Sequence, residues 1–120
     1  MVLDKLYYYR AKVISVYDGD TITVMLDMGL NQFTKIKVRL VGINTPEIRT
    51  KDLDEKKRGY QARDYLREQI LDKQVIIHTT KKGKYGRWLG IVWLMEDDND
   101  TIQKSINENL ILKGHATRYA

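Results

Sequence analysis

Three short segments of this 120-residue chain carry the side chains that metal-assisted cleavage of a phosphodiester requires. They are residues 18–21 (DGDT), 39–47 (RLVGINTPE) and 84–87 (KYGR). Carboxylate and amide oxygens can hold a divalent cation that neutralises phosphate charge and organises a water. Arginines stabilise phosphoryl oxygens as these gain charge in the transition state. No single segment suffices for this chemistry, so the fold must bring the three together.

Five segments have the composition of β-strands, being rich in β-branched and aromatic residues. The Asp-Gly step between the first two of them is typical of a hairpin turn, and taken alone it indicates nothing more. The third alternates apolar with basic side chains, as a half-buried strand does. The five segments are residues 9–16, 21–28, 33–41, 74–80 and 87–95.

Two further segments have helical patterns. Apolar residues fall at helical spacing within 60–71, and Ser105 with Glu108 forms a capping box that begins a second helix ending near residue 113. The polar tract 49–58 lacks an apolar period, which predicts a mobile surface loop, and 96–100 (EDDND) predicts an acidic turn.

Five short strands, with a helix between the third and the fourth, favour a mainly β fold. We expect a five-stranded OB-fold barrel with about two α-helices, and residues 1–120 are sized for a single domain.

The net charge of +5 is concentrated in clusters such as residues 56–58 and 81–84. Such clusters attract polyanions, although an ordinary solvated basic surface would look the same. The chain has no cysteine, so a metal would bind through oxygen or the two histidines, which favours hard cations such as calcium. With no apolar run of signal or membrane-span length, we expect no membrane partner and a cytoplasmic protein, or a secreted one if a signal was removed. We expect a monomer, with a homodimer as the alternative.

The order and spacing of the three motifs resemble those of the staphylococcal nuclease (thermonuclease) family, from about residue 13 to residue 114. Members of that family have a five-stranded OB-type barrel with packed helices, and they hydrolyse DNA and RNA with the help of calcium. The resemblance therefore implies the same fold and a nuclease activity.

The resemblance also implies a site for one calcium ion. Its ligands would be Asp20, the residue at position 44 and the backbone carbonyl of Thr45, and oxygen ligands suit calcium. Position 44 more often carries aspartate in the family, whereas this chain has Asn44. The amide oxygen can still ligate, but one negative charge is lost, which predicts weaker calcium binding.

Arg39 and Arg87 resemble the two catalytic arginines of the family, and Glu47 corresponds to its general base or water-positioning group. A guanidinium can make paired hydrogen bonds to phosphate oxygens. Taken singly, these residues would read as a strand residue, a cation beside a turn and an exposed loop carboxylate. Their occurrence together favours the catalytic interpretation.

Three further residues match substrate-binding positions. Lys84 and Tyr85 correspond to family residues that contact the nucleotide phosphate, and Tyr119 lies near the place of a base-stacking tyrosine. The sequence thus predicts a hydrolase that cuts DNA and RNA and prefers single-stranded or frayed substrate. The alternative is a non-catalytic nucleic-acid-binding module on the same fold, and a protein-interaction OB domain ranks last.

Overall fold

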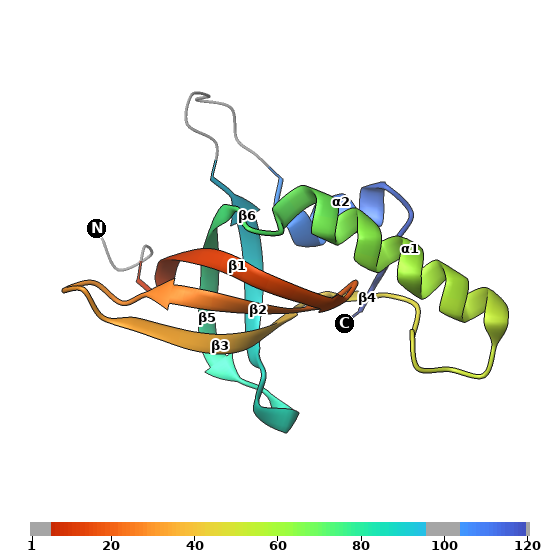
Figure 1. Cartoon of the computed structure of the whole chain (residues 1–120), viewed down its shortest axis with the longest axis horizontal. Helices are drawn as coiled ribbons and strands as arrows, with labels where there is room; N and C mark the ends of the chain where they lie inside the picture. Colours follow the sequence, from red (N-terminus) through yellow and green to blue (C-terminus); the bar gives the residue numbers. More distant parts are fainter. Residues whose placement is uncertain (1–5, 96–103, 120) are drawn as a thin grey trace.

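The computed structural model of the chain describes residues 6–95 and 104–119 (Figure 1). The predicted acidic turn at 96–100 lies outside these residues. The strands are β1 (Tyr8–Asp18), β2 (Thr21–Asp27), β3 (Phe33–Leu40), β4 (Ile43–Asn44), β5 (Gln74–Lys82), β6 (Trp88–Leu94) and β7 (Thr117–Arg118). The helices are α1 (Leu53–Ile70), the 3₁₀ turn η2 (Lys84–Gly86) and α2 (Ile106–Leu112).

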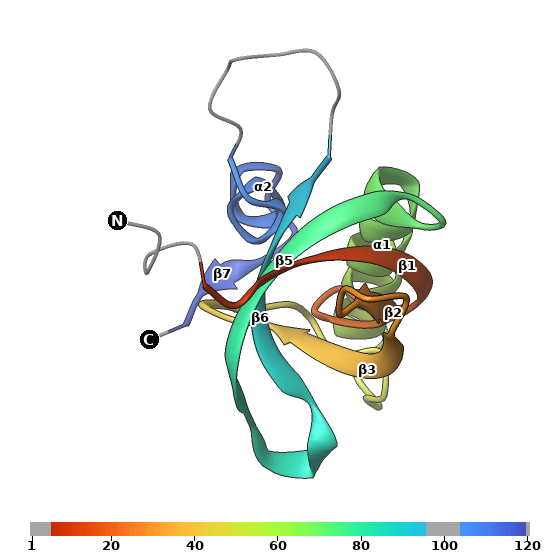
Figure 2. The same cartoon turned by 90° about the vertical axis from the view of Figure 1, so that its left-hand side faces the viewer.

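Five strands form a closed barrel in the order β1-β2-β3-β6-β5 (Figure 2). All pairs are antiparallel except β3 and β6, which run parallel and bring Val38 opposite Trp88. The pairing of β1 with β5 closes the barrel. This order, with α1 between the third and fourth barrel strands, confirms the predicted OB-fold barrel.

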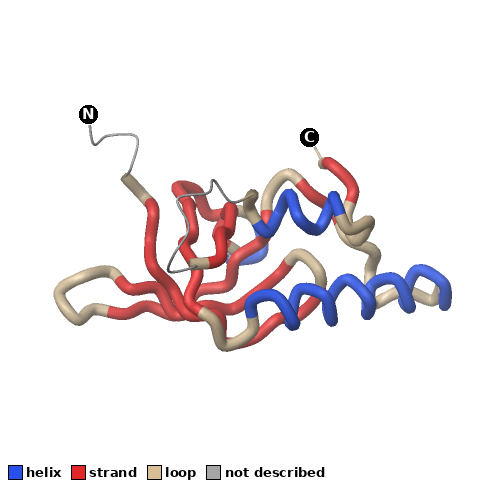
Figure 3. The backbone as a smooth tube through the Cα atoms, turned by 90° about the horizontal axis from the view of Figure 1, so that it is seen from above, coloured by secondary structure: helices blue, strands red, loops and turns tan. Residues whose placement is uncertain are grey.

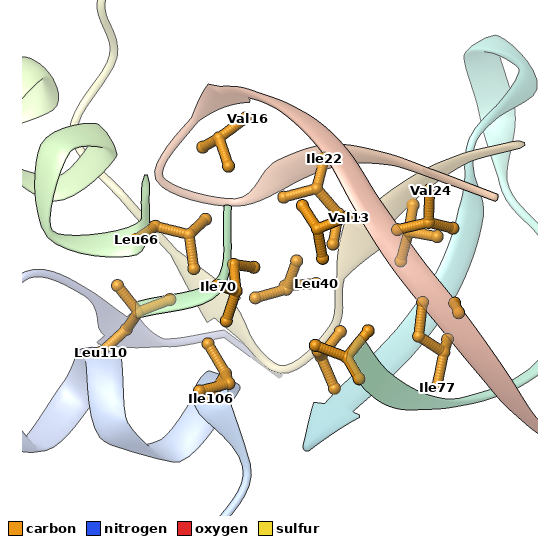
Figure 4. Close-up of a cluster of buried hydrophobic side chains, with 14 of the residues drawn as sticks. Val13, Val16, Ile22, Val24, Leu40, Leu66, Ile70, Ile77, Ile106 and Leu110 are labelled. Atoms are coloured by element: carbon orange, nitrogen blue, oxygen red, sulfur yellow. The ribbon is translucent and has the colours of Figure 1, made fainter. Parts of the chain in front are cut away.

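The core fills the barrel and continues under both helices (Figure 4). Alternate strand residues point inward because successive side chains of a strand face opposite sides. Complete burial of one such side chain contributes about 1.5–3 kcal/mol. The fully buried side chains include Val13, Ile22, Val24, Val38, Leu40, Val75, Ile77 and Val92 of the strands, and Leu66, Ile70 and Leu110 of the helices.

Helix α1 begins seven residues earlier than predicted, so the expectation of a mobile loop over 49–58 is wrong for residues 53–58. The Asp52 side chain caps the helix by accepting hydrogen bonds from the backbone N–H groups of Asp54 and Glu55, at 3.0 and 3.2 Å. The acidic Asp54 and Glu55 also suit the helix N-terminus. The first turns lack an apolar period because this end of α1 extends beyond the strands (Figure 3).

Smaller differences from the sequence prediction lie around the site. Strand β5 continues to Lys82, two residues beyond the predicted end of the fourth strand at residue 80, and the 3₁₀ turn η2 follows at Lys84–Gly86. The two-residue strands β4 and β7 form a small separate sheet that was not predicted, because so short a segment has no periodic pattern. The second helix is confirmed, with the Ser105 hydroxyl accepting from the N–H of Glu108 at 3.1 Å. Within the described residues, no helix is both long and apolar enough to cross a membrane.

A buried amide fastens α2 to the barrel. The side-chain oxygen of Asn107 accepts from the backbone N–H of Val92 at 3.1 Å. Its nitrogen donates to the carbonyl oxygens of Val41 and Gly90, at 2.9 and 3.1 Å. One side chain thus joins α2, β6 and the segment after β3.

Replacement of Asn107 by leucine is expected to lower the free energy of unfolding by about 2–4 kcal/mol, because it leaves buried backbone groups without partners. Urea denaturation followed by fluorescence measures the loss. Asn109→Ala on the same helix is the control, and it should change the free energy by less than about 0.5 kcal/mol. A loss below about 1 kcal/mol for Asn107→Leu would show that the amide does not fasten the helix.

Candidate active site

The carboxylate of Asp20 lies in the turn between β1 and β2 and contacts two other segments. One oxygen, Oδ1, accepts from the hydroxyl of Thr21 at 3.2 Å. The other, Oδ2, accepts from the hydroxyl and the backbone N–H of Thr45, at 3.1 and 3.4 Å. The side chain is only 12% exposed, so these contacts replace most of its hydration.

Arg39, near the end of β3, links Asp20 to Asn44. Its Nη2 lies 3.3 Å from Asp20 Oδ2 and donates to Asn44 Oδ1 at 2.9 Å. The guanidinium also donates to the carbonyl oxygens of Leu40 and, at 2.9 Å, of Ile43. Arg39 is therefore fixed in one orientation by the backbone that follows it.

Arg87 reaches the same cluster from the start of β6. Its Nη1 donates to the hydroxyl of Thr21 at 3.2 Å, and this hydroxyl in turn donates to Asp20. The Nε of Arg87 is buried and has no hydrogen-bond partner among the described residues. Thr21 was not singled out from the sequence, although its place directly after Asp20 in the DGDT motif was a usable signal.

Glu47 is exposed on the segment between β4 and α1. Among the described residues, no hydrogen bond or ion pair joins its side chain to Asp20, Arg39 or Arg87. The structure thus brings together Asp20, Arg39, Asn44 and Thr45 by direct contacts, and it connects Arg87 to them through Thr21. The role of Glu47 stays a prediction.

The three predicted substrate-binding residues line one cleft of about 520 Å³. We call it the first cleft; its polar and aromatic lining includes Arg39, Asn44, Lys84, Tyr85, Arg87 and Tyr119. Tyr85 has a left-handed backbone (φ +65°) and is 88% exposed, with the Arg87 guanidinium 6.0 Å from its ring centre. Tyr119 is held there by a hydrogen bond from its backbone N–H to the carbonyl of Gly42 at 2.9 Å.

Two glycines let the elements of the site approach closely. A Cβ atom on Gly19 would lie 2.8 Å from Cγ2 of Thr45 and 2.9 Å from Cβ of Ala62. A Cβ atom on Gly59 would lie 2.8 Å from the carbonyl oxygen of Glu47. The first contact brings the β1–β2 turn against Thr45, and the second presses α1 onto the segment that carries Glu47.

A second carboxylate, Asp18, stands beside Asp20. Its Oδ1 accepts from the backbone N–H of Asp20 at 3.0 Å. Burial, followed by the negative charge of Asp20, raises the pKa of Asp18 to about 6. The β1–β2 turn therefore concentrates negative charge where the fold limits its hydration.

The oxygens expected to bind calcium fit a hard cation by their chemistry. Asp20 and Asn44 supply side-chain oxygens that both lie near Arg39 Nη2, and the expected third ligand is the backbone carbonyl of Thr45, the next residue in the chain. Both side chains already contact the cationic Nη2 of Arg39, so this position attracts positive charge. In residues 6–95 and 104–119 no three His, Cys, Asp or Glu side chains gather as a metal site, and the expected set contains one carboxylate only.

Comparison with known proteins supports the interpretation of these motifs. The sequence profile described as "Staphylococcal nuclease homologue" matches residues 37–120. The chain is 34% identical over 107 residues to a thermonuclease of Staphylococcus hyicus, covering 88% of the chain and 56% of that protein. It is 31% identical over 113 residues to a micrococcal nuclease of Shigella flexneri, covering 92% and 59%.

An uncharacterised protein of Methanocaldococcus jannaschii is also similar. It is 33% identical over 134 residues, which cover 93% of this chain and 60% of that protein. The chain thus spans about three fifths of the length of the curated relatives it matches.

Replacement of Gly59 by alanine is expected to destabilise the protein by about 1–2 kcal/mol. In an open helix position the change would stabilise by about 0.5–1 kcal/mol, but here the methyl group overpacks against backbone that cannot yield. Thermal and urea unfolding measure whether the free energy of unfolding falls or rises. Glu68→Ala on an exposed turn of α1 is the control, and a gain in stability for Gly59→Ala would show that the close contact does not exist.

Proposed function

The chain belongs to the staphylococcal nuclease family, and on this premise we propose that it is a calcium-dependent phosphodiesterase. Its substrates are DNA and RNA, with single-stranded or frayed regions preferred. Water attacks phosphorus in line with the leaving oxygen, and little base specificity is expected because neither α1 nor α2, the α-helices of the described residues, is a sequence-reading helix.

The observation that carries the proposal is the state of Arg87. Its guanidinium is fixed through Thr21 to the Asp20 carboxylate, while its buried Nε has no protein partner in the described part of the chain. An unpaired buried donor is costly in a folded protein, and a catalytic role is one explanation for keeping it. Arg87 lines the first cleft, so a phosphate there would meet a guanidinium whose orientation is already fixed.

Arg39 and Arg87 have different parts in this mechanism. Arg39 is held by backbone carbonyls and by Asp20, so it supplies fixed positive charge to the first cleft. Arg87 offers the N–H groups that Thr21 does not engage to the phosphoryl oxygens as charge develops in the transition state. Loss of one such donor typically costs on the order of 100-fold or more in rate.

Asp20, Asn44 and the carbonyl of Thr45 would hold the calcium ion. When bound, calcium would neutralise phosphate charge and favour the attacking water. Glu47, exposed next to these residues in sequence, positions that water or accepts its proton. Lys84 and Tyr85 bind the phosphate of the nucleotide in the first cleft, and Tyr119 stacks on its base.

Arg87→Ala is expected to slow cleavage of a labelled single-stranded DNA oligonucleotide in calcium by about 100-fold or more. Arg87→Lys should recover little, because lysine cannot reproduce the paired donors. Glu47→Ala is expected to reduce the rate by about 100-fold or more if Glu47 takes the proton. Gel analysis of the products, with and without excess chelator, measures these rates.

The matched controls are Arg10→Ala and Glu68→Ala, which remove the same charges from exposed positions outside the site. Both should keep the parent rate within about twofold. Tight, salt-sensitive binding without any cleavage in calcium would replace the nuclease proposal by the non-catalytic binding module.

Asn44→Asp is expected to tighten calcium binding by restoring one negative ligand charge. Titration calorimetry of the parent and the variant, without nucleic acid, measures both dissociation constants. The added charge would also strengthen the contact with Arg39, which competes for the same oxygen. Unchanged or weaker calcium affinity would mean that this competition dominates or that position 44 is not a ligand.

A further inference from the structure

A larger cleft lies on the other side of Arg87. We call it the second cleft; it has a volume of about 1010 Å³ and is bordered by β1, β2, β3, residues 48–50 and α1. Arg87 and Tyr85 line both clefts, so the two meet at the residue that carries the proposed chemistry. The proposed function assigns substrate contacts to the first cleft alone.

Among the described residues, the charged side chains that line the second cleft are all positive. The chain as a whole has 21 Lys and Arg against 16 Asp and Glu, yet no carboxylate of residues 6–95 and 104–119 lines this cleft. One lining arginine, Arg63, is paired outside the cleft with Asp64 at 3.0 Å. The lining cations are Lys37, Arg49, Lys56, Arg63, Arg67 and Arg87.

Aromatic rings accompany these cations. Tyr17 is 56% exposed and Tyr85 is 88% exposed, so both side chains are accessible from solvent. Tyr60 lies under Arg63, with the guanidinium carbon 4.5 Å from the ring centre. A positive groove with exposed aromatic rings matches the way in which proteins bind single-stranded nucleic acid, by tracking phosphates and stacking bases.

The position of the cleft in the fold supports the same ligand. Thr23 on β2 and Lys37 on β3 are paired across the two strands and both line it. The face of the second and third strands is where OB-folds generally bind oligonucleotides. An OB-fold covers about 4–16 nucleotides, whereas the first cleft has only about half the volume of the second.

We infer that the second cleft binds the part of a single strand that continues beyond the scissile phosphate, away from the nucleotide in the first cleft. The inference rests on the proposed function, because it assigns the path of the same substrate. The strand then crosses Arg87, with its phosphates near Lys56 and Arg63 and its bases near Tyr17. Such a path makes affinity increase with strand length.

The experiment measures binding of fluorescent oligothymidylates of 2 to 12 nucleotides in excess chelator, over a range of salt concentrations. The test variant is Lys56→Ala with Arg63→Ala. The control is Lys57→Ala with Arg10→Ala, which removes the same charge from exposed positions that line neither cleft. A separate Tyr17→Ser variant tests stacking.

The test variant should bind the 12-nucleotide strand about tenfold or more weakly, with a loss that grows with length. The slope of log affinity against log salt should fall by about 0.7 for each phosphate contact removed. Tyr17→Ser should weaken binding by about tenfold, since one stacked base contributes about that much. The loss of affinity in the control should be less than half of the loss in the test variant.

Equal losses in the test variant and the control, or a loss that does not depend on length, would overturn the inference. Absence of cleavage in calcium, together with a selective loss in the test variant, would refute the nuclease and retain the second cleft. Normal cleavage, together with parent-like binding by all variants, would support the nuclease proposal and refute the binding of the strand in the second cleft. If the double variant does not fold, the same binding measurement is made on Lys56→Ala as the test variant and Lys57→Ala as the control.

Discussion

The arrangement of the site depends on the interactions of the Asp20 carboxylate. It receives hydrogen bonds from Thr45 on one side and Thr21 on the other, and it pairs with Arg39. These partners belong to β2, to β3 and to the segment after β4, while Arg87 joins from β6 through Thr21. A side chain that is nearly withdrawn from water must satisfy its charge within the protein, so it fixes its neighbours in return.

Arg39 and Arg87 differ in how many of their hydrogen-bond donors this cluster engages. Arg39 has its donors turned towards Asp20, Asn44 and two backbone carbonyls, and its orientation is therefore determined by the protein alone. Arg87 makes one hydrogen bond, to Thr21, and keeps a buried donor that the described residues do not satisfy. From the motifs alone the two arginines look equivalent. The structure distinguishes Arg39, which the protein holds on several sides, from Arg87, whose buried Nε has no partner among the described residues.

The barrel and the second helix were predictable because their signals are periodic or local. Alternating strands, the Asp-Gly turn and the pair Ser105 and Glu108 each specify structure over a few residues. The start of α1 was missed because its first turns extend into solvent and so carry no apolar stripe; only the cap at Asp52 marked it. The short strands β4 and β7 were missed because their pairing joins distant segments without any pattern of their own.

For the site, the residue types were predictable and the contacts were not. Asp20, Asn44, Thr45, Arg39 and Arg87 were named from three motifs, and the structure places them in one connected cluster. The linking role of Thr21 depends on β2, β3 and β6 lying side by side, which no local pattern encodes. The close approaches at Gly19 and Gly59 likewise depend on α1 packing against segments far away in the chain.

The parallel pairing of β3 with β6 has a consequence for the order of folding. It joins Val38 to Trp88, fifty positions apart, so a long loop must close before that contact forms. The β1–β2 hairpin is local and can form while the later strands are still being synthesised. Arg87 then meets Thr21 only when the barrel closes. A nascent chain thus displays the carboxylates of the turn well before it assembles the cluster around them, and the cluster is complete only once β6 has been synthesised.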